Sequence, residues 1–171
     1  MQHSTRKLGA TFTWLGWILG FFLLVLLFQQ ILDRQNNPNQ SVKTVSGNGF
    51  YEIKLERNRQ GHYVLDGEIN HHKVTFLIDT GATTTSIPES VSNRLGLHKG
   101  APITVDTANG TTTAYITRLD SLRLGLIEFN DVLASINPGY NSDEILLGMN
   151  ILKNLELVQR GNTLIVRTPG S

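Results

Sequence analysis

The feature that most limits the possible folds is a long uncharged segment near the N-terminus. Between Leu8 and Leu32 the chain has no charged residue, and the stretch Trp14–Phe28 is almost entirely apolar. Roughly 20 mostly apolar residues are enough for a helix to cross a bilayer. A helix that is apolar on all sides is rarely the core helix of a small domain. We therefore predict a transmembrane anchor over residues 11–32.

A cleaved signal peptide is the main alternative to an anchor. Cleavage requires small residues at the site, and the stretch Phe28–Asp33 has no small-x-small pattern. Arg6 and Lys7 precede the span, whereas one acidic and one basic residue follow it directly. The positive-inside tendency then places residues 1–10 in the cytoplasm and the rest of the chain outside it, in the periplasm of a two-membrane bacterium.

The composition of the chain changes from apolar to polar after the predicted span. Residues 33–49 are polar and are predicted to form a flexible linker. From Phe50 onward, short runs with strand character alternate with turn residues. We predict that residues 50–171 form a mainly β domain, a small closed barrel, with short helices around Pro88–Leu95 and Met149–Asn154. The strands are predicted at Phe50–Glu56, Tyr63–Ile69, Val74–Ile78, Ile103–Ala108, Thr111–Leu119, Ser121–Leu124, Asp131–Ile136, Leu155–Gln159 and Thr163–Arg167.

Composition excludes several functions. The net charge is +1 and the basic residues are scattered, so no nucleic-acid partner is expected. The chain has no cysteine, which rules out disulfides, thiol catalysis and cysteine metal sites. His71 and His72 are neighbours, whose side chains point to opposite faces on a strand, and no third ligand is evident nearby. We read them as turn residues and expect no metal.

One carboxylate stands at the end of an apolar run. Phe76–Ile78 leads directly into Asp79, which is followed by small and hydroxyl-bearing residues. An ionised aspartate is costly to bury unless hydrogen-bond donors surround it. The hydroxyls of Thr80 and Thr83 and the unobstructed backbone at Gly81 are suitable donors. This arrangement indicates a catalytic carboxylate.

The same residues resemble a known family. Asp79–Ala82, after three hydrophobic residues, resembles the active-site signature of aspartic peptidases. Downstream, Asn109-Gly110 looks like the flap hairpin of the single-lobe, retropepsin-like enzymes, and residues 145–150 resemble their hydrophobic-hydrophobic-Gly element. An arginine commonly follows that glycine in the retroviral enzymes. Here Met149 takes its place, which leaves open how this region is braced.

The resemblance implies a fold, an assembly and a role for each motif. The fold would be the single-lobe acid-protease barrel. Such a peptidase needs two carboxylates, and the chain has one Asp-Thr-Gly sequence, so Asp79 from each subunit of a homodimer would form the catalytic dyad. The substrate would be an extended polypeptide, and no cofactor is implied. The other motif residues would be Thr80, Gly81, Ala82 and Thr83 in the active-site loop, Asn109 and Gly110 at the flap tip, and Gly148 and Asn150 in the structural glycine motif.

Other readings of these residues stay open. Asp79 could cap a turn, Asn109-Gly110 could be a plain hairpin turn, and Gly148 could simply start a helix. A peptidase-like module could bind peptides, or act as a membrane scaffold, without significant proteolysis. The loop after Asp79 also resembles the phosphate loops of sugar kinases, but roughly 120 residues of short strands cannot supply the two α/β domains that those enzymes need.

Overall fold

The computed structural model describes residues 2–47, 49–107 and 110–169, and the chain divides into the units Met1–Gln35 and Asn36–Ser171. The first unit is helix α1 (Gln2–Asn36), whose last residue begins the second unit. Within α1, the segment Trp14–Asn36 contains an 18-residue window with a mean hydropathy of 2.2, and none of that window is buried. By length and composition, α1 is able to cross a membrane.

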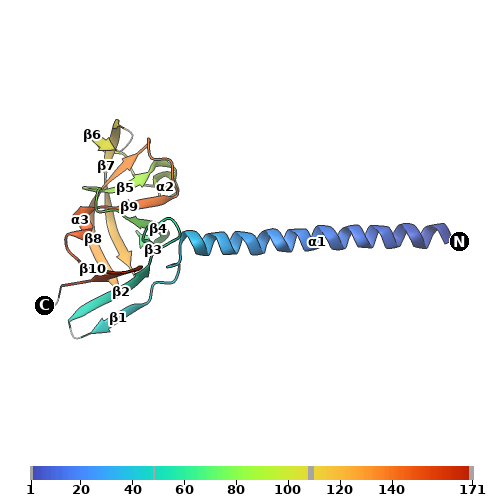
Figure 1. Ribbon diagram of the computed structural model, residues 1–171. Helices are drawn as coiled ribbons and strands as arrows, with labels where there is room; N and C mark the ends of the chain where they lie inside the picture. Colours follow the sequence, from blue (N-terminus) through green and yellow to red (C-terminus); the bar gives the residue numbers. More distant parts are fainter. Residues whose placement is uncertain (1, 48, 108–109, 170–171) are drawn as a thin grey trace. The chain divides into compact units, whose positions relative to one another are not determined.

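Strands dominate the described part of the second unit (Figure 1), which confirms the prediction of a mainly β fold with two short helices. The predicted and observed bounds agree for two strands, β2 (Phe50–Glu56) and β11 (Thr163–Arg167). The other strands are β1 (Thr44–Gly47), β3 (Val64–Ile69), β4 (His72–Ile78), β5 (Thr85–Pro88), β6 (Pro102–Thr107), β7 (Gly110–Leu124), β8 (Ile127–Asn137), β9 (Glu144–Leu147) and β10 (Glu156–Arg160). The helices are α2 (Glu89–Arg94) and α3 (Met149–Leu152).

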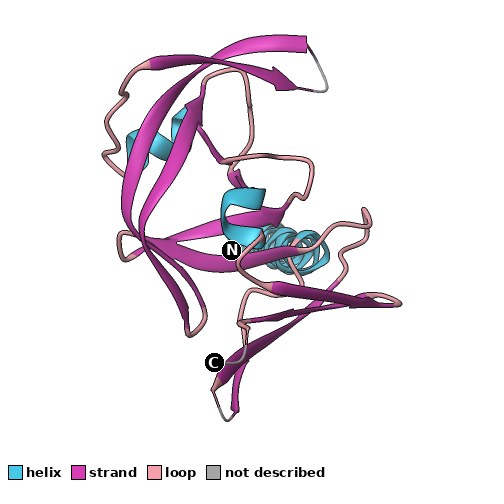
Figure 2. Ribbon diagram, turned by 90° about the vertical axis from the view of Figure 1, so that its left-hand side faces the viewer, coloured by secondary structure: helices cyan, strands magenta, loops and turns pink. Residues whose placement is uncertain are grey.

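The larger sheet closes on itself as an uneven barrel (Figure 2). Its strand order is β3-β4-β9-β5-β8-β7-β6, and an extra pairing joins β3 to β7. Two of the joints are thin: β5 meets β9 through the single pair Ser86↔Leu146, and β3 meets β7 through two residue pairs. The long β7–β8 ladder supplies the most extensive pairing in this sheet.

A smaller antiparallel sheet, in the order β1-β2-β11-β10, packs its inner side on the same core. Buried apolar side chains from both sheets form one cluster, which removes them from water and stabilises the unit. Its members include Ile53, Leu55, Phe76, Leu119, Leu122, Ile145, Leu147, Leu164 and Val166.

Two short strands of the barrel were not predicted. All four residues of β5 are buried, so this strand has no polar and apolar alternation to reveal it. β9 is also only four residues long. Conversely, the separate strands predicted before and after Asp120 form one continuous strand, β7, because it pairs with β8 on both sides of that residue.

The polar segment after the span is more ordered than a flexible linker. Asn39 is buried; its side-chain amide donates to the carbonyls of Val64 and Glu56, at 2.7 and 2.9 Å, and its Oδ1 accepts from the Glu56 N–H. Asn37 donates to Asp66 Oδ1 at 2.6 Å. Asn39 supplies hydrogen-bond partners that the backbone at the end of β2 and the start of β3 would otherwise lack, and Asn37 holds a side chain of β3. The folded unit therefore begins at Asn36 rather than at Phe50.

Candidate active site

The position of Asp79 follows from the strand that precedes it. β4 lies between β3 and β9, and its Phe76 side chain is fully buried. The strand pairing ends at Ile78↔Leu147, and the Asp79 N–H still donates to the Leu147 carbonyl at 3.2 Å. The half-buried residue Asp79 therefore stands at the end of a strand that is paired on both sides.

The residues after Asp79 form a tight loop around its carboxylate. Gly81 N–H donates to Asp79 Oδ1 at 2.8 Å, and Ala82 N–H donates to the Asp79 carbonyl at 3.2 Å. A Cβ on Gly81 would stand 3.1 Å from Oδ1, which is closer than ordinary contact, so the glycine permits this approach. Thr80 and Thr83 are exposed on the same loop, and Ala82 is half-buried.

The Asp79 loop rests on the segment that follows β9. Met149 N–H donates to the Ala82 carbonyl at 2.7 Å, and Asn150 N–H donates to the Thr83 carbonyl at 3.0 Å. A Cβ on Gly148 would lie 2.5 Å from the Thr84 carbonyl carbon and 2.9 Å from the Ala82 oxygen. Gly148 thus allows direct backbone contact between the two segments.

Asn150, one residue after the position at which the retroviral enzymes commonly have an arginine, braces this contact. Its Oδ1 accepts from the Thr85 N–H at 2.8 Å and from the Thr85 hydroxyl at 3.0 Å, and its Nδ2 donates to the Leu133 carbonyl at 2.8 Å. Thr85 is fully buried. One amide side chain therefore ties α3 to β5 and β8, while Met149 remains partly exposed.

Replacing Asn150 by alanine is expected to destabilise the second unit by about 2 kcal/mol, because two buried donors of Thr85 lose their acceptor. Chemical unfolding followed by circular dichroism measures this difference. Asn154→Ala is the matched control, since the Asn154 side chain makes one exposed hydrogen bond, to the Asn150 carbonyl. An equal loss in both variants would contradict the bracing role.

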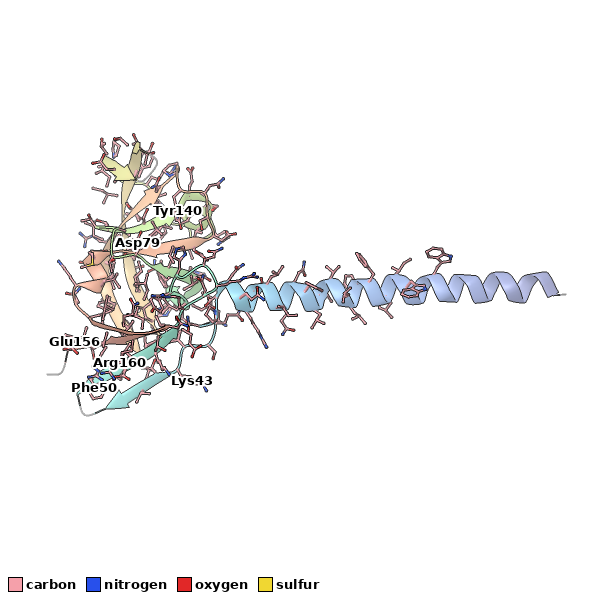
Figure 3. The ribbon with its side chains drawn as sticks, in the orientation of Figure 1. Lys43, Phe50, Asp79, Tyr140, Glu156 and Arg160 are labelled. Atoms are coloured by element: carbon pink, nitrogen blue, oxygen red, sulfur yellow. The ribbon has the colours of Figure 1, made fainter. Side chains whose placement is uncertain are left out.

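Tyr140 lies within electrostatic range of Asp79 and was not predicted from the sequence; Figure 3 labels both residues. Burial raises the pKa of the Tyr140 phenol, the negative charges of Glu144 and Asp79 raise it further, and a hydrogen bond with Ser142 opposes the shift. The sequence offers one weak signal, the Pro138-Gly139 turn that separates β8 from this tyrosine. The loop between β8 and β9 thus brings a phenol into the electrostatic range of the candidate catalytic carboxylate.

Glu144, the first residue of β9, is also perturbed. Burial raises the pKa of its carboxyl above the ordinary 4.5, and the nearby positive charge of His62 acts in the opposite direction. The folded state therefore disfavours ionisation. The stability that accompanies the protonated group is fully present below about pH 4.5 and is lost as the pH rises through the raised pKa.

Glu144→Gln is accordingly expected to be close to the wild-type protein in stability at about pH 3.5 and more stable than it at about pH 7. Unfolding curves across this range measure the difference between the two proteins. Glu56→Gln, at an exposed position on β2, is the control. Its difference in stability from the wild-type protein is expected not to increase with pH. A constant difference between Glu144→Gln and the wild-type protein at every pH would contradict the assignment.

The flap region is a hairpin that extends beyond the rest of the sheet. β6 pairs with the first part of β7, and β8 joins β7 only from Tyr115 onward, so residues 110–114 pair with β6 alone. The register pairs Thr107 with Gly110, so Gly110, which was predicted to lie in the turn, is the first residue of β7, with φ of 106°. Asn109 lies outside the described residues. The middle of the hairpin lies close to the loop after β8, where a Cβ on Gly139 would stand 3.1 Å from Thr112 Oγ1.

The structure thus brings some of the predicted site residues together and leaves others apart. Asp79, Gly81, Ala82 and Thr83 form one hydrogen-bonded unit with Asn150, and Gly148 packs closely against it. Gly110 belongs to the projecting hairpin. Across the ranges that the structure describes, no three His, Cys, Asp or Glu side chains form a potential metal cluster. His71 lies in the β3–β4 turn with φ of 65°, as predicted. His72, which was also predicted to be a turn residue, is instead the first residue of β4.

A comparison with protein families matches residues 65–154 to the model described as gag-polyprotein putative aspartyl protease. The matched segment contains both the Asp79 loop and the Gly148–Asn150 support. Among solved structures, the crystal structure of a retropepsin-like aspartic protease from Rickettsia conorii is similar, with a TM-score of 0.60 and 28% identity. The match covers 75% of this chain and 96% of that one.

Two curated proteins are also similar in sequence, and both are described as uncharacterised. One, from a Sinorhizobium species, is 26% identical over 125 residues, which are 71% of this chain and 54% of the relative. The other, from Rickettsia prowazekii, is 31% identical over 108 residues, which are 61% of this chain and 46% of the relative. The chain therefore spans about half the length of these relatives.

Proposed function

The chain belongs to the gag-polyprotein putative aspartyl protease family and has a retropepsin-like fold, and on this premise we propose that it is an aspartic endopeptidase active as a homodimer. The observation that carries the proposal is the Asp79 loop: an aspartate at the end of a strand paired on both sides, with one carboxylate oxygen held by the Gly81 N–H. The loop is in turn held by the backbone of Met149 and Asn150.

Two copies of Asp79 would share one proton at the two-fold axis, because two carboxylates in close contact cannot both ionise cheaply. The ionised member would take a proton from a bound water, which attacks the peptide carbonyl, while the protonated member donates to the carbonyl oxygen. Thr80, exposed beside Asp79, would join the two loops through its hydroxyl. The β6–β7 hairpin would close over an extended polypeptide and exclude water.

The proposal includes a membrane location, supported by the length and apolar composition of α1. The N-terminus would be cytoplasmic and the second unit extracytoplasmic, since Arg6 and Lys7 stand at the N-terminal side of the apolar stretch. Treating intact and permeabilised cells with an external protease tests this orientation. Digestion of the second unit only after the inner membrane is opened would contradict it.

The direct test is cleavage of a diverse peptide mixture by the full chain in detergent micelles, from about pH 4 to about pH 8. We expect fragments that disappear when a statine-type transition-state mimic is added. Mass spectrometry of the fragments gives the cleavage preference. A folded, dimeric protein that cuts none of the peptides would contradict the peptidase function and would favour a peptide-binding module.

A further inference from the structure

The strand that leads to Asp79 has one face on the core and one face on the candidate active site. On β4, Phe76 is buried in the core, whereas Leu77 and its partner on β9, Leu146, are not among the core residues. The Asp79 N–H continues the ladder by donating to the Leu147 carbonyl. Side chains alternate along a strand, so Leu77 and Asp79 lie on the same face, away from the core.

Glu144 of β9 belongs to this face too. β9 runs parallel to β4 and pairs Glu144 with Thr75. The next residue, Ile145, is buried in the core, so Glu144 points to the opposite face, which carries Asp79. Thr75 precedes Asp79 by four residues. Along β4, Glu144 is therefore about 13 Å from Asp79, roughly the length of four residues of an extended peptide.

Two acidic side chains stand in the same row of this face, and they differ in their partners. Asp66 of β3 pairs with Thr75 from the other side of β4. Its Oδ1 accepts from Asn37 Nδ2 at 2.6 Å and from the Thr75 hydroxyl at 2.9 Å. Glu144, by contrast, is half-buried and takes part in no salt bridge with any residue of 2–47, 49–107 or 110–169.

The surroundings of Glu144 favour the arrival of a positive charge. Burial raises the pKa of its carboxyl, and the charge of His62, an exposed residue ahead of β3, only opposes this effect. A cation placed beside a carboxylate favours its ionised form. A positive group brought to Glu144 would therefore be bound by a carboxylate that has no basic partner in the described chain.

Tyr140 is connected to Glu144 through a serine. Ser142 Oγ accepts from the Glu144 N–H at 3.0 Å, and the Tyr140 phenol forms a hydrogen bond with the same side chain. Burial raises the pKa of the Tyr140 phenol, and the charges of Glu144 and Asp79 raise it further, so the phenol lies within electrostatic range of both acids. The loop between β8 and β9 thus adds an aromatic ring to the face that carries the two carboxylates.

A carboxylate and an aromatic ring together suit a cation. We propose that Glu144 and Tyr140 bind a cationic side chain of the substrate, arginine in particular, within about four residues of the cleaved bond. A guanidinium group is planar, stacks on an aromatic face and donates two parallel hydrogen bonds to a carboxylate. Lysine supplies the charge without the planar fork and would bind less well.

This selectivity rests on the proposed function, because the substrate has to lie along the face that carries Asp79. In a homodimer, each copy supplies one Glu144 and one Tyr140. Arginine would therefore be favoured on both sides of the cleaved bond.

The test compares arginine with citrulline, which has nearly the same shape and no charge. Peptides that the full chain cuts in micelles are remade with either residue at each of about four positions on both sides of the cleaved bond. At about pH 6, we expect kcat/KM for the arginine peptide to exceed that for its citrulline counterpart at least about tenfold at one or more positions. Glu144→Gln should lower this ratio to less than about twofold and leave kcat/KM for the citrulline peptide unchanged.

Asp143→Asn is the matched control, because Asp143 is the neighbouring acid, is exposed and pairs with Arg94 at 2.8 Å. It should keep the wild-type preference. Tyr140→Phe retains the ring and should also keep it, whereas Tyr140→Leu should lose it. An unchanged preference in Glu144→Gln, an equal loss in Asp143→Asn, or equal effects of Glu144→Gln on both peptides would overturn the assignment.

Binding measured without catalysis separates this proposal from the peptidase function. The full chain carrying Asp79→Asn is titrated with two mixtures of fluorescent short peptides that differ only in arginine or citrulline. We expect the arginine mixture to bind at least about fivefold more tightly, and the two to bind equally once Glu144→Gln is added. A protein that cuts peptides without favouring arginine would reject the arginine site alone. Arginine-selective binding by a wild-type protein that never cuts would reject the peptidase alone, and neither binding nor cleavage would reject both.

Discussion

Asp79→Asn is expected to abolish peptide cleavage, with a fall in kcat/KM of at least about 100-fold. The amide keeps an oxygen that can accept the Gly81 N–H, so the loop that holds position 79 is retained. What the variant loses is the ability to take a proton from water and to share a proton with its symmetry mate. Fragment formation from a peptide identified in the mixture measures the loss, and circular dichroism checks the fold.

Asp120→Asn is the matched control, because Asp120 is an exposed aspartate on β7 outside the Asp79 loop. It is expected to cut as the wild-type protein does. Asp79→Asn activity close to that of Asp120→Asn would contradict the catalytic assignment.

Mixing provides a second reading of the same variant. Suppose that each active site needs Asp79 from both copies. An equal amount of Asp79→Asn protein, allowed to exchange partners with the wild-type protein, should then lower the cleavage activity per wild-type chain to about 50% of its value in the wild-type protein alone. Activity that simply tracks the amount of wild-type protein would instead indicate a site within one chain.

Gly148→Ala is expected to lower the free energy of unfolding of the second unit by about 3 kcal/mol and to remove activity with it. The new methyl group would meet the Thr84 carbonyl carbon at 2.5 Å and the Ala82 carbonyl oxygen at 2.9 Å. These are backbone atoms, so they can move only if the Asp79 loop shifts away from its support. Both tryptophans lie in α1, so circular dichroism rather than tryptophan fluorescence should follow the unfolding.

Gly61→Ala is the control for Gly148→Ala, because it introduces backbone strain without steric crowding. Gly61 has φ of 90° with nothing within 4 Å of a new Cβ, so this substitution costs only the unfavourable backbone conformation. It should destabilise the protein by about 1 kcal/mol and leave cleavage intact. Equal losses for Gly148→Ala and Gly61→Ala would mean that contact with the loop is not the reason for the glycine.

The local sequence pattern was enough to predict a strand or a helix wherever the segment itself carries such a pattern. β2 and β11 alternate between the core and the outside, and their bounds agree with the prediction. β5 and β9 were not predicted as strands, because each is four residues long and owes its conformation to neighbours in the barrel. Asn37 and Asn39 read as linker residues, since their partners lie on distant strands: the Asp66 side chain for Asn37, and the backbone of Glu56 and Val64 for Asn39.

The sequence by itself determined the chemistry near residue 79: an aspartate after an apolar strand, a glycine that frees an N–H for it, and a second glycine at position 148. Only the tertiary structure decided that Asn150 braces the loop through Thr85 and that Tyr140 comes within electrostatic range of Asp79. The physical reason is the separation in sequence between the residues that interact. Hydrogen bonding within a turn depends on neighbouring residues, whereas contacts between distant segments are set by how the whole barrel packs.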